Sequence, residues 1–114
     1  MNDCLFCKII AGEIPSTRVY EDDLCYAFKD ISPQAATHIL LIPKKHIASL
    51  HDASAQDQAL LGALLLKASE IAEKQGIAAT GYRVTTNIGE HGCQSVKHLH
   101  LHILGGEQLK GEMG

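Results

Sequence analysis

The sequence lacks the features of a membrane protein, a secreted protein or a nucleic-acid scaffold. Its longest apolar run, Ala59–Leu66, is far shorter than the roughly 20 residues that a membrane-spanning helix needs. The formal net charge is -3 and no basic stripe is present, which argues against a nucleic-acid partner. Residues 1–3 carry no basic side chain, and Lys8 interrupts the apolar run that follows, so no secretory signal is expected. We therefore predict a cytoplasmic protein with neither a nucleic-acid nor a membrane partner.

The chain also lacks internal repeats, low-complexity tracts and linkers, which predicts a single domain over residues 1–114. Its 46% hydrophobic and 20% charged residues are ordinary for a globular protein. A chain of this length has only a modest core, and dimerisation would add to the surface that it buries.

Hydrophobic periodicity predicts an α+β domain. Alternation typical of a half-buried strand is present in 24–29, and Ser54–Asp57 resembles a capping box that opens one long helix. The expected order is one short helix, three strands, the long helix and two strands, and the absence of βαβ alternation favours an antiparallel sheet. The expected elements with assigned bounds are a helix at 4–12, strands at 24–29 and 38–43, the long helix at 55–75, a strand at 81–87, a loop at 88–96 and a strand at 98–104.

Three histidines alternate with apolar residues near the C-terminus, at positions 98, 100 and 102. On a strand they would face one way, about 6.6 Å apart in succession and about 13 Å between the outer two. That span is too long for one metal ion to bind all three comfortably, so at least one is available for other chemistry. A neutral imidazole is an effective nucleophile toward phosphorus, and a rigid strand would hold it in place. The alternative is a solvated strand face that happens to be rich in histidine.

These residues and several other segments resemble the histidine triad (HIT) family of nucleotide hydrolases and transferases. The run from Phe28 to His38, the run from Ile42 to Ile47, and Gly92–Val96 are similar to its branch of purine nucleoside phosphoramidases, as is Leu104–Gly106 after the triad. The resemblance extends from about Leu5 to Gly106. It implies a HIT-like fold, namely a five-stranded antiparallel sheet with one long and one short helix, and a homodimer.

The resemblance also implies roles for individual residues. His100 would be the nucleophile, with His102, Ser95 and His38 as the other catalytic residues. Asn87 and the backbone N–H groups near Ser95 and Val96 would hold phosphate oxygens, and an apolar set would enclose a purine. The full predicted nucleotide site is Leu5, Phe6, Ile9, Phe28, Asp30, Ile31, Leu40, Asn87, Cys93, Ser95, Val96, His100 and His102. The plain alternatives are that Phe28, Leu40 and Ile9 belong to the core, and that Asp30 and Ser95 cap turns.

A second candidate site begins with Cys4 and Cys7. A Cys-x-x-Cys pair without a secretory signal indicates a metal or redox site, and its position at the start of the chain, not after a strand, favours metal. The resemblance implies that His46 and His98 complete a structural zinc site. The alternatives are two buried thiols and a loop hydrogen bond for His46. We expect the metal to shape the purine-binding wall without touching phosphate.

The expected reaction is hydrolysis of purine nucleoside 5'-phosphoramidates or acyl-nucleotides at the α-phosphate. Transferases of the family usually carry glutamine at the third triad position, so His102 favours hydrolysis over transfer. Cys93 stands where this branch commonly has glycine, and a positive φ there would cost about 1 kcal/mol or more. The alternative functions are a dinucleoside polyphosphate hydrolase and a zinc-stabilised nucleotide-binding or interaction module with little catalysis.

Overall fold

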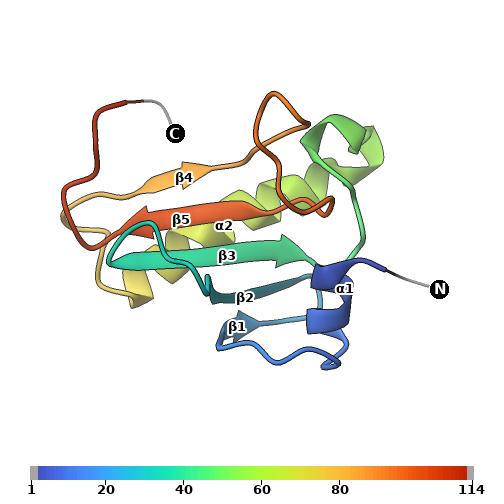
Figure 1. Ribbon diagram of the computed structural model, residues 1–114, viewed down its shortest axis with the longest axis horizontal. Helices are drawn as coiled ribbons and strands as arrows, with labels where there is room; N and C mark the ends of the chain where they lie inside the picture. The colour runs from blue at the N-terminus through green and yellow to red at the C-terminus, as the bar shows by residue number, and fades with distance from the viewer. Residues whose placement is uncertain (1–2, 113–114) are drawn as a thin grey trace.

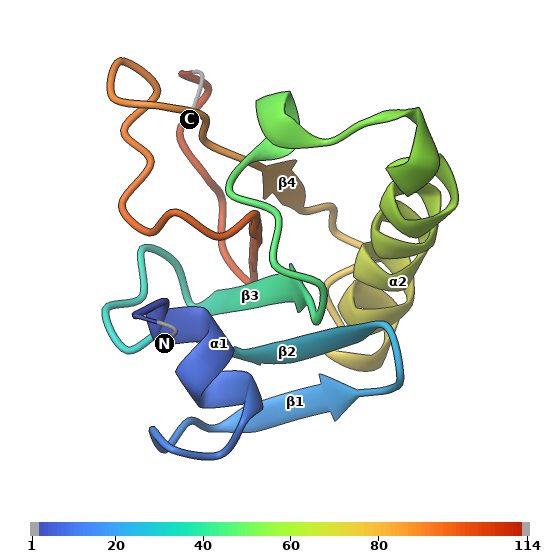
Figure 2. The ribbon, with the colours of Figure 1, turned by 90° about the vertical axis from the view of Figure 1, so that its right-hand side faces the viewer.

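The computed structural model describes residues 3–112 and contains a five-stranded sheet between two helices. In Figure 1 the strands lie side by side with α2 behind them, and Figure 2 shows α1 and α2 on opposite sides of the sheet. The strand order is β1-β2-β3-β5-β4, and all neighbouring strands are antiparallel. The predicted fold is confirmed. The elements are α1 (Leu5–Ile10), β1 (Arg18–Glu21), β2 (Cys25–Lys29), β3 (Thr37–Pro43), α2 (Gln58–Lys74), β4 (Arg83–Thr85) and β5 (Leu101–Gly105).

The long helix begins where the capping box predicts. The backbone N–H of Ser54 donates to Asp57 at 2.9 Å, and a 3-10 turn at Ala55–Asp57 leads into α2. Its buried face consists of Leu64, Ala68, Ile71 and Ala72, as the periodicity indicates. The apolar spacing of Leu60, Leu61, Leu64 and Leu65 predicts that Leu65 shares this face, but Leu65 is 60% exposed. Among the described residues, no helix combines the length and apolarity needed to cross a membrane.

The strand β2 corrects the prediction of a half-buried strand, because four of its five residues are buried. Cys25 and Ala27 pack with residues of α2, whereas Tyr26 and Phe28 pack with Phe6 and Ile9 of α1. Both faces of the sheet are therefore covered at this point. The alternating pattern correctly separates the residues of the two sheet faces. It does not show that α1 covers the face opposite α2.

The predicted strand at 98–104 is wrong at its start. β5 begins only at Leu101, so His98 and His100 precede the sheet ladder. Side-chain alternation nevertheless continues through this segment, since Leu99 and Leu101 pack in the core on the α2 side. The backbone of 98–100 must therefore be held by contacts other than strand pairing.

Candidate functional site

The middle histidine of the triad has its ring orientation fixed by the backbone. His100 is 2% exposed, and its Nδ1 lies 2.7 Å from the carbonyl oxygen of His98. A carbonyl oxygen only accepts hydrogen bonds, so Nδ1 carries the proton and Nε2 keeps its lone pair. The ring is flanked by Phe6 and His102, at centroid distances of 5.1 and 5.0 Å. This is the tautomer that a nucleophile attacking through Nε2 needs.

A chain of hydrogen bonds also fixes the tautomer of His102. The backbone N–H of Gln34 donates to His38 Nδ1 at 3.0 Å, so the neutral His38 ring carries its proton on Nε2. That nitrogen lies 2.9 Å from His102 Nδ1, which must accept, and the remaining proton of His102 therefore resides on Nε2. His38 and His102 meet because β3 and β5 are neighbours, with Leu40 opposite His102. One backbone amide thus determines the protonated nitrogen on two rings.

Both of these rings are held neutral. Burial lowers the pKa of His38, although the Asp30 carboxylate opposes this effect. Burial, reinforced by the charges of His100 and His38, lowers the pKa of His102 to about 4. At neutral pH His102 is therefore an uncharged donor through Nε2.

Asp30 lies at the edge of this network. Its Oδ2 is 3.5 Å from His38 Nε2, and its Oδ1 accepts from the backbone N–H of Ser32 at 2.7 Å. The turn-capping role considered for Asp30 is therefore present, and it fixes the direction of the carboxylate. The Asp30 side chain is only partly buried, at 18% exposure, so it stays accessible to a ligand.

The loop before the triad is built from tight backbone contacts. Asn87 Nδ2 donates to the carbonyl oxygen of Gly92 at 2.7 Å. A Cβ at Gly92 would lie 2.3 Å from the carbonyl oxygen of Ile88, so this position has no room for a side chain. Cys93 adopts φ +63°, the left-handed conformation anticipated for a site where glycine is usual. Ser95 follows in this loop and is exposed.

Two residues that support this loop received no role from the sequence. Gln94 Nε2 donates to the carbonyl oxygens of Ala48 and Val96, at 2.6 and 2.9 Å. Thr86 Oγ1 donates to the carbonyl oxygen of His100 at 2.8 Å. In the sequence, Gln94 is recognisable only as a glutamine inside a Gly-containing loop, and this does not reveal which carbonyl oxygens it bonds.

The predicted purine-binding residues divide into two groups. Phe6, Ile9, Phe28 and Leu40 form a buried cluster with Tyr26 and Ile42. Leu5 and Ile31 lie outside it, at 44% and 97% exposure. The alternative that Phe28, Leu40 and Ile9 belong to the core is therefore confirmed by their packing. A fully exposed isoleucine gains nothing from folding, and it remains available to cover a ligand.

The Cys-x-x-Cys pair meets two histidines from distant parts of the chain. The sulfur or Nδ1 atoms of Cys4, Cys7, His46 and His98 all lie within 4.8 Å of one another. Cys4 Sγ is 3.2 Å from His98 Nδ1, and Cys7 Sγ is 3.3 Å from His46 Nδ1 and 3.6 Å from His98 Nδ1. The two Nδ1 atoms are 3.2 Å apart.

These four residues fit a zinc ion. Bond lengths of about 2.0 Å to nitrogen and 2.3 Å to sulfur separate tetrahedral ligand atoms by roughly 3.3–3.8 Å. His98 Nε2 lies 2.8 Å from the carbonyl oxygen of Pro43, so the proton is on Nε2 and the Nδ1 lone pair points into the cluster. Cys7 N–H donates to Cys4 Sγ at 3.3 Å, which orients that sulfur.

A second group, Asp30, His38 and His102, also brings three metal-ligand atoms within 4.8 Å. Metal binding at His38 Nε2 would require the proton on Nδ1, where the Gln34 N–H already donates. The tautomer therefore disfavours metal and favours a hydrogen-bonded chain at this place. These are the two such groups within residues 3–112.

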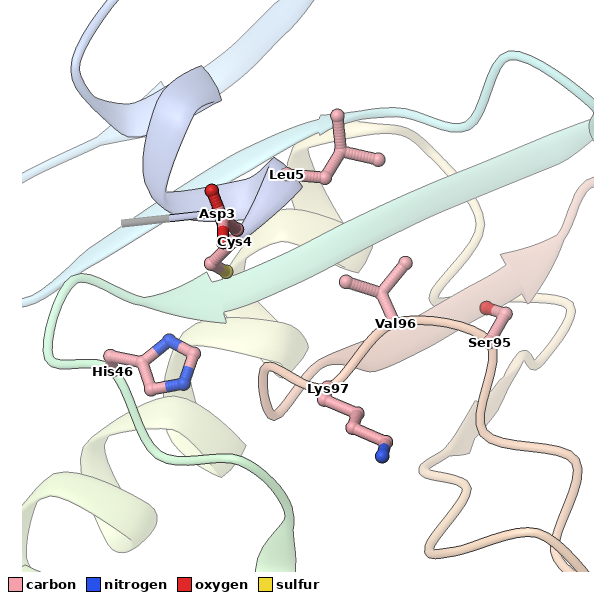
Figure 3. Close-up of a pocket in the computed structure, with 7 residues that line it drawn as sticks. All are labelled: Asp3, Cys4, Leu5, His46, Ser95, Val96 and Lys97. Carbon is pink, nitrogen blue, oxygen red and sulfur yellow. The ribbon is translucent and has the colours of Figure 1, made fainter. Parts of the chain in front are cut away.

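A pocket of about 540 Å³ opens beside the zinc-type cluster. Figure 3 shows Asp3, Cys4 and Leu5 along one side, His46 at one end, and Ser95, Val96 and Lys97 on the opposite loop. A separate pocket, lined by His38, His102, Asn87 and neighbouring residues, opens on the other side of the triad.

Comparison with known proteins connects this geometry to one family. The family model described as HIT domain matches residues 11–109. The chain is 51% identical to the purine nucleoside phosphoramidase of Escherichia coli K12, over 94% of this chain and 90% of that protein. It is 57% identical to a HIT-like protein of Synechocystis, over 98% and 97% of the two chains. A HIT family hydrolase from Legionella pneumophila superimposes with a TM-score of 0.96 at 49% identity, covering 98% of this chain and 100% of that one. A histidine triad protein from Clostridium difficile gives 0.95 at 47% identity, with 99% and 98% coverage.

Proposed function

This chain belongs to the HIT domain family, and from that premise we propose that it hydrolyses purine nucleoside 5'-phosphoramidates or acyl-nucleotides through a nucleotidyl-His100 intermediate. The observation that carries the proposal is the bond from His100 Nδ1 to the His98 carbonyl, which leaves Nε2 as the nucleophilic atom. A relative at 51% identity is named a purine nucleoside phosphoramidase, which supports the substrate class.

In the first step, His100 Nε2 attacks the α-phosphorus and forms a P–N bond, and the bond from phosphorus to the leaving amine or acid breaks. The His98 carbonyl, already bonded to Nδ1–H, stabilises the positive charge that develops on the ring. His102 Nε2–H donates to a phosphate oxygen, and the Ser95 hydroxyl assists the leaving group with its proton. In the second step, water attacks phosphorus and the P–N bond to His100 breaks. A proton of this water restores the Ser95 hydroxyl, and the nucleoside monophosphate is released.

The rest of the nucleotide would lie along the sheet face that α1 covers. Asp30 would accept hydrogen bonds from the ribose hydroxyls, because the Ser32 N–H fixes the direction of its carboxylate through Oδ1. The purine would contact the buried cluster from outside, with the exposed Leu5 and Ile31 closing over it. Asn87, Cys93 and Val96 would complete the phosphate loop.

Cys4, Cys7, His46 and His98 would hold a structural zinc ion, which fills its coordination shell and contributes to folding. Thiolate ligands of this kind persist in the reducing cytoplasm, where we place the protein. Zinc takes no part in either chemical step.

We further propose that the protein acts as a homodimer, joined across α2 and the outer edge of β4. β4 is an edge strand, and Leu65 and Leu66 of α2 are 60% and 70% exposed. Leu65 also lines a small apolar pocket together with Thr86, which follows β4. Such a face, with an unpaired strand edge next to it, is typical of an interface. Sedimentation equilibrium should give a dimer for the wild type and a monomer for Leu66→Lys; a monomeric wild type would contradict this part.

Intact-mass analysis after rapid mixing with an adenosine phosphoramidate tests the main proposal. The wild type and the control His51→Ala, an exposed histidine outside the site, should show a nucleotidyl adduct and a burst of product. His100→Ala should show neither. Faster turnover of a dinucleoside polyphosphate would indicate the other hydrolase branch, and tight nucleotide binding without an adduct would indicate a binding module.

A further inference from the structure

The segment that carries the nucleophile lies outside the sheet, so something other than strand pairing must hold it. β5 begins at Leu101, one residue after His100. Instead, Leu99 N–H donates to the carbonyl oxygen of Ile47 at 2.7 Å, and His98 Nε2–H to that of Pro43 at 2.8 Å. Both acceptors flank His46 in the chain. Residues 98–100 are thus bonded to the loop that supplies one of the zinc-type ligands.

His98 joins the two sites within one residue. Its side chain is fully buried and directs Nδ1 into the Cys4–Cys7–His46 group, while its carbonyl oxygen accepts the His100 Nδ1 proton at 2.7 Å. A displacement of residue 98 therefore disturbs both the metal-ligand group and the carbonyl that sets the nucleophile's tautomer.

The helix α1 provides a second connection. Phe6 lies between the two cysteines in sequence, and its ring meets the His98 and His100 rings edge-on at 5.9 and 5.1 Å. A six-residue helix has little stability of its own, so its position depends on what anchors it. The two cysteine ligands lie at its start, on either side of this ring.

Resting on the proposed function, we propose that the Cys4–Cys7–His46–His98 group is a positioning device for the nucleophile, with His98 as the positioning residue. Metal occupancy then controls kcat through the orientation of His100. This adds a second role to the expectation that the metal shapes the purine-binding wall without touching phosphate.

The test uses His46, an exposed ligand that contacts the His98 ring and has no part in either proposed chemical step. His46→Ala removes one ligand, whereas His46→Cys keeps four ligands as a Cys₃His set that zinc also accepts. Lys8→Ala, which lies on α1 next to Cys7 and supplies no metal-ligand atom, is the control. Metal content is measured in each protein, folding is checked by circular dichroism, and kcat and KM are determined with an adenosine phosphoramidate.

For His46→Ala we expect loss of metal and a fall in kcat of roughly 10- to 100-fold, because misplacing a reacting group by about 1 Å costs that much. His46→Cys should recover both metal and kcat. Metal loss with unchanged kcat overturns the proposal, and so does a rise in KM alone.

A spectroscopic measurement tests the positioning role independently of enzymatic activity. Long-range ¹H–¹⁵N correlation spectra of the histidine rings report which nitrogen of His100 is protonated. The wild type, Lys8→Ala and His46→Cys should show one Nδ1–H tautomer, and His46→Ala a mixture. An unchanged tautomer without metal overturns the positioning role even if the enzyme is active. Absence of a His100 adduct in the wild type would instead overturn the proposed function.

Discussion

Acidification should destabilise this protein measurably through His102. The pKa of this ring is lowered from 6.5 to about 4, first by burial and then by the charges of His100 and His38. Between these two values the unfolded chain binds a proton that the folded chain does not, so stability decreases as the pH decreases. The loss begins as the pH falls below about 6.5 and is complete below about 4.

The magnitude follows from the two pKa values. Between pH 7 and pH 5, linkage gives a loss of about 2 kcal/mol in the free energy of unfolding. Water reaches part of the ring, so this is an upper value. The change is large for a small domain, whose total stability is about 5–15 kcal/mol.

Urea unfolding at pH 7 and pH 5 measures this loss in the wild type and in His102→Gln, at matched metal content and protein concentration. Protonation of the groups that do not contact His102 then cancels in the comparison. The wild type should lose about 2 kcal/mol more than His102→Gln, and His51→Gln, which alters an exposed histidine, should behave like the wild type. Equal losses in the wild type and His102→Gln would show that the folded protein does not hold His102 neutral.

Three further changes probe the network and the loop. His38→Ala should lower kcat/KM about tenfold in steady-state hydrolysis, because His102 loses the bond that fixes its tautomer; an unchanged rate would contradict the hydrogen-bonded chain. Cys93→Gly should raise stability by up to about 1 kcal/mol in thermal unfolding by removing the strain of φ +63°, with no gain for Cys93→Ala. Gly92→Ala should abolish adduct formation in a folded protein, because its Cβ would lie 2.3 Å from the Ile88 carbonyl oxygen; a normal adduct yield would refute this.

Much of the fold follows from local patterns. The capping box at Ser54–Asp57 and the periodicity of the following apolar residues locate α2 nearly to its ends. Both patterns depend on residues that are close together in the sequence, because helix caps and helical periodicity involve neighbours within one or two turns. The start of β5 was misplaced because alternation is a property of side chains, and it continued through His98 and His100 without strand pairing.

Burial was harder to infer than periodicity. Leu65 belongs to the apolar pattern of α2 and yet lies outside the core of the single chain, while both faces of β2 are covered. Whether an apolar residue is buried depends on which element packs against it, and that information is not contained in its neighbours along the chain.

The sequence alone determined the residue types of the site: three alternating histidines, a Cys-x-x-Cys pair and a Gly-containing loop, together sufficient to indicate the family. Only the tertiary structure decided how each ring is protonated. The deciding groups are the N–H of Gln34 and the carbonyl oxygens of Pro43 and His98. Every residue carries such backbone groups, so no sequence pattern marks these three. They determine the protonation of the rings because β3, β5 and the loops beside them bring each group within hydrogen-bond distance of a ring nitrogen.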